Sequence, residues 1–131
     1  MARQYSSISV ETTLASGISS TATTMTVAAG TGSALLGGVT LAAGNVDQFT
    51  VALDPDTTNE EIVFITAAST DTFTITRARA GTSGVTHSAG ATVKHVLTSD
   101  DLNAFKASIS PVANVGSLGL HLVLLQYRQQ R

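Results

Sequence analysis

The sequence contains no cysteine and no tryptophan, and only 12% of its 131 residues are charged. The absence of cysteine excludes disulfides and thiol catalysis. A formal net charge of −2 gives no general attraction to nucleic acid or to an anionic membrane surface. Scarce charge suits permanent contacts, because little charge must be desolvated when such surfaces meet. The composition therefore favours an assembly component.

Long hydrophobic runs are also missing. The most apolar stretch, residues 118–125, includes His121 and is far shorter than the ~20 residues that cross a bilayer. The opening residues MARQYSSISV lack the apolar core of a secretory signal. We therefore expect a soluble chain, of a length common for one domain. Threonine, serine and glycine take the place of charge, and β-branched threonine favours strands.

Alternating residues predict most of the strands. Residues 6–30 predict two short strands joined by a turn at Ser16 and Gly17, and Gly30–Gly44 predicts a loop around a short strand at Val39–Ala42. Four longer strands are predicted at Gln48–Leu53, Glu60–Ala67, Thr72–Arg79 and Ala91–Leu97. Turns at Asp54–Asp56 and Ser69–Asp71 separate the first three of these. The middle two are expected to form an antiparallel hairpin with Phe73, Ile75 and Arg77 on one face.

One helix is predicted at residues 99–109, where Thr98 or Ser99 caps its start and Asp100 and Asp101 favour the positive end of its dipole. Leu102, Phe105 and Ile109 recur at helical spacing, and Pro111 ends the element. We predict a mainly β fold, a small antiparallel β-sandwich or barrel-like domain with this one short helix. The chain divides into an N-terminal arm (1–11), a β-rich module (12–110) and a C-terminal docking segment (111–131).

The docking segment carries leucines that fit either a strand or a helix. Leucine-rich termini on small domains more often dock than hang free. The residues expected to make assembly contacts are Tyr5, Leu118, Leu120, Leu122, Leu124, Tyr127 and Arg128.

The residues that could carry chemistry do not assemble into a recognisable site. His87 and His95 lack the companions at metal-ligand spacing that zinc requires, so no metal is predicted. Asp100 and Asp101 are explained by helix capping, and neighbouring Glu60 and Glu61 face opposite sides of a strand. The sequence has no GxSxG elbow and no evident His–acid pair to activate a nucleophile. Glycines 81, 84 and 90 are too widely spaced for a phosphate cradle, so we predict neither catalysis nor a cofactor.

The arginines of the hairpin have two interpretations. Arg77 and Arg79 alternate along one strand and could bind an anion or a neighbouring carboxylate. The simpler hypothesis is that Arg77 and Arg79 brace the following loop through its carbonyls, and that His87 is a hydrogen-bonding residue of that loop.

A longer pattern resembles a known family. EEIVFIT at 60–66, TFTITR at 72–77, AGT at 80–82 and HSAGATV at 87–93 follow one another, and the chain continues with HVLTSDDL. This order resembles a small β-module of virion structural proteins of tailed bacteriophages, over about residues 12–102.

The resemblance implies a structural, non-enzymatic role as a capsid decoration, cement or head-fibre protein. It implies the major capsid protein and further copies of this chain as partners, by analogy in a homotrimer, with synthesis in the host bacterial cytoplasm and a final place on the capsid surface. Two alternatives stay open: a tail or baseplate component, and a receptor- or glycan-binding module on a fibre. The second is poorly supplied, because aromatic residues make up only 5% of the chain.

Overall fold

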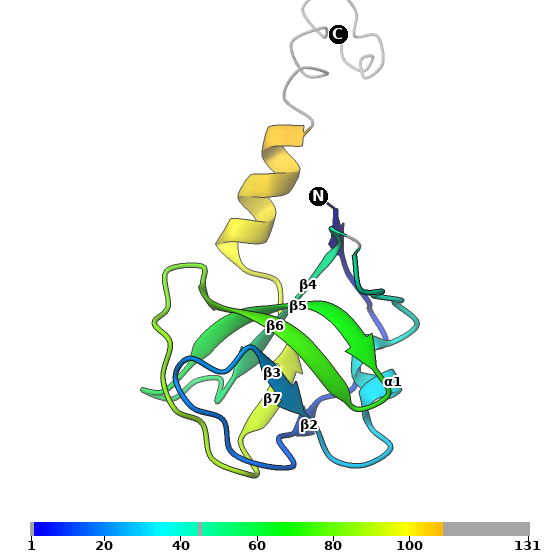
Figure 1. Cartoon of the computed structure of the whole chain (residues 1–131). Helices are drawn as coiled ribbons and strands as arrows, with labels where there is room; N and C mark the ends of the chain where they lie inside the picture. Colours follow the sequence, from blue (N-terminus) through cyan, green and yellow to red (C-terminus); the bar gives the residue numbers. More distant parts are fainter. Residues whose placement is uncertain (1, 45, 109–131) are drawn as a thin grey trace, which may run out of the picture. The chain divides into compact units, whose positions relative to one another are not determined.

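A computed structural model of the chain describes residues 2–44 and 46–108. The fold is mainly β, as predicted, with an antiparallel sheet that curls into a half-barrel. The strand order is β2-β7-β4-β5-β6-β3, and β1 pairs with the start of β4 in parallel (Figure 1). The strands are β1 (Arg3–Gln4), β2 (Thr12–Thr13), β3 (Thr24–Thr26), β4 (Gln48–Leu53), β5 (Glu61–Ser69), β6 (Thr72–Arg79) and β7 (Thr92–His95).

The outer strands of this sheet are themselves linked. Leu14, just after β2, forms an isolated antiparallel bridge with Val27, just after β3. The Ala15 N–H donates to the Thr26 carbonyl at 2.8 Å, and the Ala28 N–H donates to the Thr13 carbonyl at 2.9 Å. The two strands predicted within residues 6–30 are therefore present, and each pairs mainly with a distant strand, β7 or β6.

The hairpin of β5 and β6 matches the prediction closely. Phe73 and Ile75 are buried, whereas Thr72, Thr74 and Thr76 on the opposite face are exposed. Arg77 lies on the buried face with its side chain only 9% exposed. The inner face joins one continuous hydrophobic core whose fully buried members include Phe49, Val51, Leu53, Val63, Ile65, Phe73 and Val93.

The prediction for Gly30–Gly44 was wrong. The stretch forms a short helix, α1 (Gly32–Leu36), and residues 39–42 form no strand. Both carboxylate oxygens of Asp71 accept backbone N–H groups at the helix start, from Gly30 at 3.0 Å and Gly32 at 2.9 Å. Asp71 lies in the β5–β6 turn, so the acceptor for this helix start is 39 residues away from Gly32 and is invisible to local pattern.

The predicted helix near residues 99–109 is present over 99–108 in the described part of the chain. Two members of its apolar stripe, Leu102 and Phe105, are more than half exposed. Ile109, Pro111 and the rest of the docking segment lie outside the described residues.

Candidate functional site: a buried ionic cluster

Glu61 is the first residue of β5, and its side chain is fully buried. Its alternate neighbours along the strand, Val63 and Ile65, belong to the hydrophobic core. A carboxylate in this position loses its hydration and must be compensated by hydrogen bonds and opposite charge. The residues that surround Glu61 supply both.

Arg77 of β6 provides the first compensation through a two-pronged ion pair with Glu61. Its Nε donates to Oε2 at 2.8 Å and its Nη2 donates to Oε1 at 2.7 Å. Such bidentate pairing fits the planar guanidinium to the carboxylate in both distance and orientation. The next residue, Ala78, has a positive φ of 55°, and its backbone N–H donates to Oε2 at 2.9 Å.

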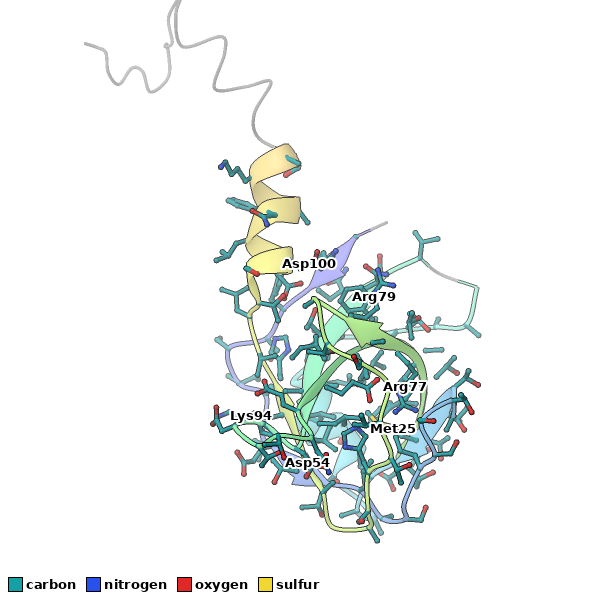
Figure 2. All side chains as sticks on the ribbon, turned by 90° about the vertical axis from the view of Figure 1, so that its left-hand side faces the viewer. Met25, Asp54, Arg77, Arg79, Lys94 and Asp100 are labelled. Carbon is teal, nitrogen blue, oxygen red and sulfur yellow. The ribbon has the colours of Figure 1, made fainter. Side chains whose placement is uncertain are left out.

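His87 lies between two carboxylates. Its Nε2 is 3.0 Å from Oε1 of Glu61, and its Nδ1 is 2.7 Å from Oδ2 of Asp54, which follows β4. An imidazolium, with a hydrogen on each ring nitrogen, satisfies both acceptors at once. Asp54, Glu61, Arg77 and His87 are the four side chains of the cluster. Figure 2 labels Arg77 on β6 and Asp54 after β4, two of these residues.

The cluster also holds two loops. Arg77 donates to the carbonyls of Ser19 at 2.7 Å and Ala22 at 3.0 Å in one loop, and of Val85 at 2.7 Å in the other. The Val85 N–H in turn donates to Oε1 of Glu61 at 3.2 Å. The loops approach so closely that a Cβ on Gly84 would lie 2.8 Å from the Ser20 carbonyl oxygen. The cluster therefore fastens both loops to the sheet.

These contacts decide the acidity of Glu61. Burial alone raises the pKa of its carboxyl, but hydrogen bonds from Arg77, His87 and the backbone N–H groups of Ala78 and Val85 outweigh burial and lower the pKa to about 2. Glu61 is therefore an anion at neutral pH and cannot serve as a proton donor there.

The cluster is closed to solvent on most sides. The side chains of Glu61 and His87 are completely buried, and that of Asp54 is 25% exposed. Within the described residues, the hydrogen bonds of the four side chains run to one another and to backbone groups. A polar groove of about 400 Å³ lies beside Asp54, and its lining is Asp54, Thr57, Thr58, Asn59, Ser88, Ala89, Gly90 and Ala91. Across residues 2–44 and 46–108, no group of three or more His, Cys, Asp or Glu side chains is placed to hold a metal ion.

The remaining predicted site residues lie apart from this cluster. Arg79 is exposed, and its guanidinium lies 5.1 Å from the centre of the Phe64 ring, which Arg3 also approaches at 4.7 Å. Tyr5 is 45% exposed on the N-terminal arm. His95 ends β7 and contacts that arm. The other predicted assembly residues, Leu118, Leu120, Leu122, Leu124, Tyr127 and Arg128, lie outside the described part of the chain.

The sequence reasoning missed Asp54 and Glu61. It found no evident His–acid pair, because His87 is 26 residues from Glu61 and 33 from Asp54 in the chain. One signal was available: Glu61 shares its strand face with Val63 and Ile65, which places a charge on the core side. Glu60 accepts the Asp56 N–H at 3.1 Å and is only part-exposed, so the two adjacent glutamates do have separate surroundings.

Comparisons with protein-family models and with curated protein sequences find no match for this chain. The only described helices are α1 and residues 99–108, and neither is long and apolar enough to cross a membrane.

Proposed function

We propose that this protein is a structural component of a tailed-bacteriophage virion, and that it binds the outer capsid surface and stabilises the shell without catalysing a reaction. One observation carries the proposal. Glu61, Arg77 and His87, which belong to the motifs of the phage-module resemblance, form a closed ionic cluster whose bonds hold loops in place. Residues with this role suit a rigid module more than an open reaction site.

The stabilising mechanism is mass action. A protein that binds only the assembled lattice lowers the free energy of the assembled state and so opposes disassembly. The major capsid protein and neighbouring copies of this chain, by analogy in a trimer, are the proposed partners. Repetition over many symmetric positions makes a modest energy per contact effective.

Apolar side chains on the N-terminal arm support a role in contact. Ile8 is 72% exposed and Val10 is 58% exposed, beside the part-exposed Tyr5. Exposed apolar groups gain free energy when a partner covers them. The arm, together with the C-terminal docking segment, is therefore where we place the capsid contacts.

Electron microscopy of labelled protein on purified particles of the virus that encodes it tests the proposal. Label distributed over heads supports capsid decoration. Label confined to tails or baseplates supports the alternative structural role, and absence from all particles contradicts a virion function.

A truncated chain tests the docking segment. We expect deletion of residues 118–131 to abolish or greatly weaken particle binding, measured by co-sedimentation with the shells. An Arg79→Ala variant, which leaves both termini intact, is the matched control and should bind normally. Full binding by the truncated chain would remove this segment from the mechanism.

A further inference from the structure

His95 joins the sheet to the N-terminal arm through both of its ring nitrogens. Its Nδ1 lies 2.7 Å from the carbonyl oxygen of Thr50 on β4. Its Nε2 lies 3.3 Å from the backbone nitrogen of Ser6. The ring also stacks on Phe49, with centroids 4.0 Å apart and an interplanar angle of 12°. Two hydrogen bonds and one stacking contact therefore fix the position of the imidazole.

The two partners of His95 demand one protonation state. A carbonyl oxygen only accepts a hydrogen bond, so Nδ1 must carry a hydrogen. A backbone N–H only donates, so Nε2 must be bare. The neutral imidazole with its hydrogen on Nδ1 meets both demands, whereas an imidazolium would direct an N–H at the Ser6 N–H. His87 is the opposite case, because both of its ring nitrogens face carboxylates.

Three elements pack most closely against β7: β4, β2 and α1, with the sequences QFTVAL, TT and GSALL. None of these three contains a carboxylate or another ionisable side chain that could compensate a positive charge on His95. Within β7 itself, Lys94 is the only neighbouring charge, and it is a cation. From the arm, the tilted ring of Tyr5 faces His95 at 6.5 Å between centroids.

Loss of the hydrogen bond between the Ser6 N–H and His95 would affect a groove at the end of β7. Ser6 lines a shallow apolar groove of about 340 Å³ together with Tyr5, Ser7, His95, Val96 and Leu97. On its other side, Ser6 Oγ donates to the Gly37 carbonyl at 2.8 Å, and the Val10 N–H donates to the Ala34 carbonyl at 2.9 Å. These bonds contain no titrating group, so Ser6 and Val10 would stay attached beside α1 while the Ser6 backbone N–H turned away from His95 at the end of β7.

We propose that His95 is a pH-sensitive latch: its protonation releases Ser6 and opens the groove between residues 5–7 and the end of β7. Histidine is the side chain whose charge commonly changes between pH 5 and 8, so a titration over that range tests the release. Because a proton on Nε2 is compatible only with the open latch, each pH unit below the midpoint of that protonation favours opening by up to about tenfold.

An NMR titration of the full chain from pH 8 to pH 5 tests the latch. We expect the amide proton of Ser6 to move to the position of an unbonded amide, with the same midpoint as the ring protons of His95. The amides of Gly30 and Gly32, which donate to the carboxylate of Asp71, should not move in this range. They serve as internal references, because these two hydrogen bonds lower the pKa of Asp71 and it stays ionised throughout.

A His95→Gln variant provides the matched control. Glutamine offers one amide donor for Thr50 and one carbonyl acceptor for Ser6 and has no charge to gain, so the Ser6 amide should be insensitive to pH. A Ser6 amide that still moves in the variant overturns the proposal. In the unsubstituted chain alone, a His95 ring that stays neutral down to pH 5, or a Ser6 amide that ignores its titration, overturns it equally.

Discussion

The side chains of the ionic cluster compensate one another for the loss of hydration on burial. Burial of any charged member without its partners would be unfavourable. Glu61 is paired with the guanidinium of Arg77, and the ring of His87 bonds the carboxyl groups of both Glu61 and Asp54. A buried ion pair adds little net stability, because desolvation offsets most of the attraction. Removal of one partner is costly, since the other charge then stays buried without compensation. The cluster therefore acts mainly by specifying where two loops lie.

Replacement of Arg77 tests this dependence. We expect Arg77→Ala to lower the free energy of unfolding by about 3–5 kcal/mol, because Glu61 keeps its charge in a dry site. Arg79→Ala removes an exposed arginine two residues away on the same strand and loses only a contact with Phe64, at a cost of about 1 kcal/mol or less. Urea denaturation followed by circular dichroism measures both. Equal losses would contradict the special position of Arg77.

The pH dependence of stability follows from the lowered pKa of Glu61. The carboxyl titrates near its ordinary value of 4.5 in the unfolded chain and at about 2 in the folded chain. Its contribution is therefore fully present above about pH 4.5 and is lost as the pH falls towards 2, and it amounts to about 3 kcal/mol. The free energy of unfolding of the unsubstituted chain should decline through this range. A Glu61→Gln variant should be less stable at neutral pH and should show a flatter decline. Parallel curves for the two proteins would show that other carboxyls govern acid unfolding.

At the scale of elements, β6 ends in an irregular region that the ionic cluster requires. The pairing of β5 with β6 shifts register between Ile62 and Phe64, and Ala78 and Ala80 both have positive φ values, 55° and 51°. The left-handed conformation costs an alanine energy that glycine does not lose. At Ala78 it directs a backbone N–H to Glu61. The left-handed backbone at the end of β6 therefore supplies one of the hydrogen bonds to the Glu61 carboxylate.

Ala80 has a similar positive φ, but its N–H does not donate to Glu61. Relief of its backbone strain should therefore stabilise the protein. We expect Ala80→Gly to raise the free energy of unfolding by about 0.5–1 kcal/mol, since glycine adopts a positive φ without strain. The reciprocal change at the next residue, Gly81→Ala, places a side chain at φ 82° and should destabilise by about 1 kcal/mol or more. Thermal unfolding of both variants measures the difference. A destabilised Ala80→Gly protein would contradict this account of the turn.

The elements differ in how far sequence pattern could predict them. Gln48–Leu53 and Thr72–Arg79 were predicted with their observed ends, because alternation along a half-buried strand is a local signal. The helix α1 was not predicted, because the N–H groups at its start donate to Asp71, which lies in the distant turn between β5 and β6. A five-residue helix is too short to be stable alone, so its formation depends on that distant contact.

At the scale of the whole molecule, residues 1–98 form a compact unit of their own. Every member of the hydrophobic core cluster lies between Leu14 and Val93. The ionic cluster also belongs entirely to this unit. The unit therefore contains what a domain needs in order to fold.

A chain that ends at Thr98 should accordingly fold. We expect one cooperative thermal transition and the strand content of the full chain, measured by calorimetry and circular dichroism. The same protein should fail to bind particles if the docking segment makes the capsid contacts, which separates folding from assembly. A truncated chain without a cooperative transition would show that residues beyond 98 are needed for the fold.

The sequence by itself determined the β class, the main hairpin and the helix after residue 98, because each depends on periodicity or capping within a few neighbouring residues. It also placed Arg77 on the inner face of its strand. Only the tertiary structure brought Asp54, Glu61, Arg77 and His87 together, since the partners of a buried charge are chosen by how distant strands pair. The same holds for His95, whose protonation state depends on a carbonyl 45 residues away and an amide 89 residues away.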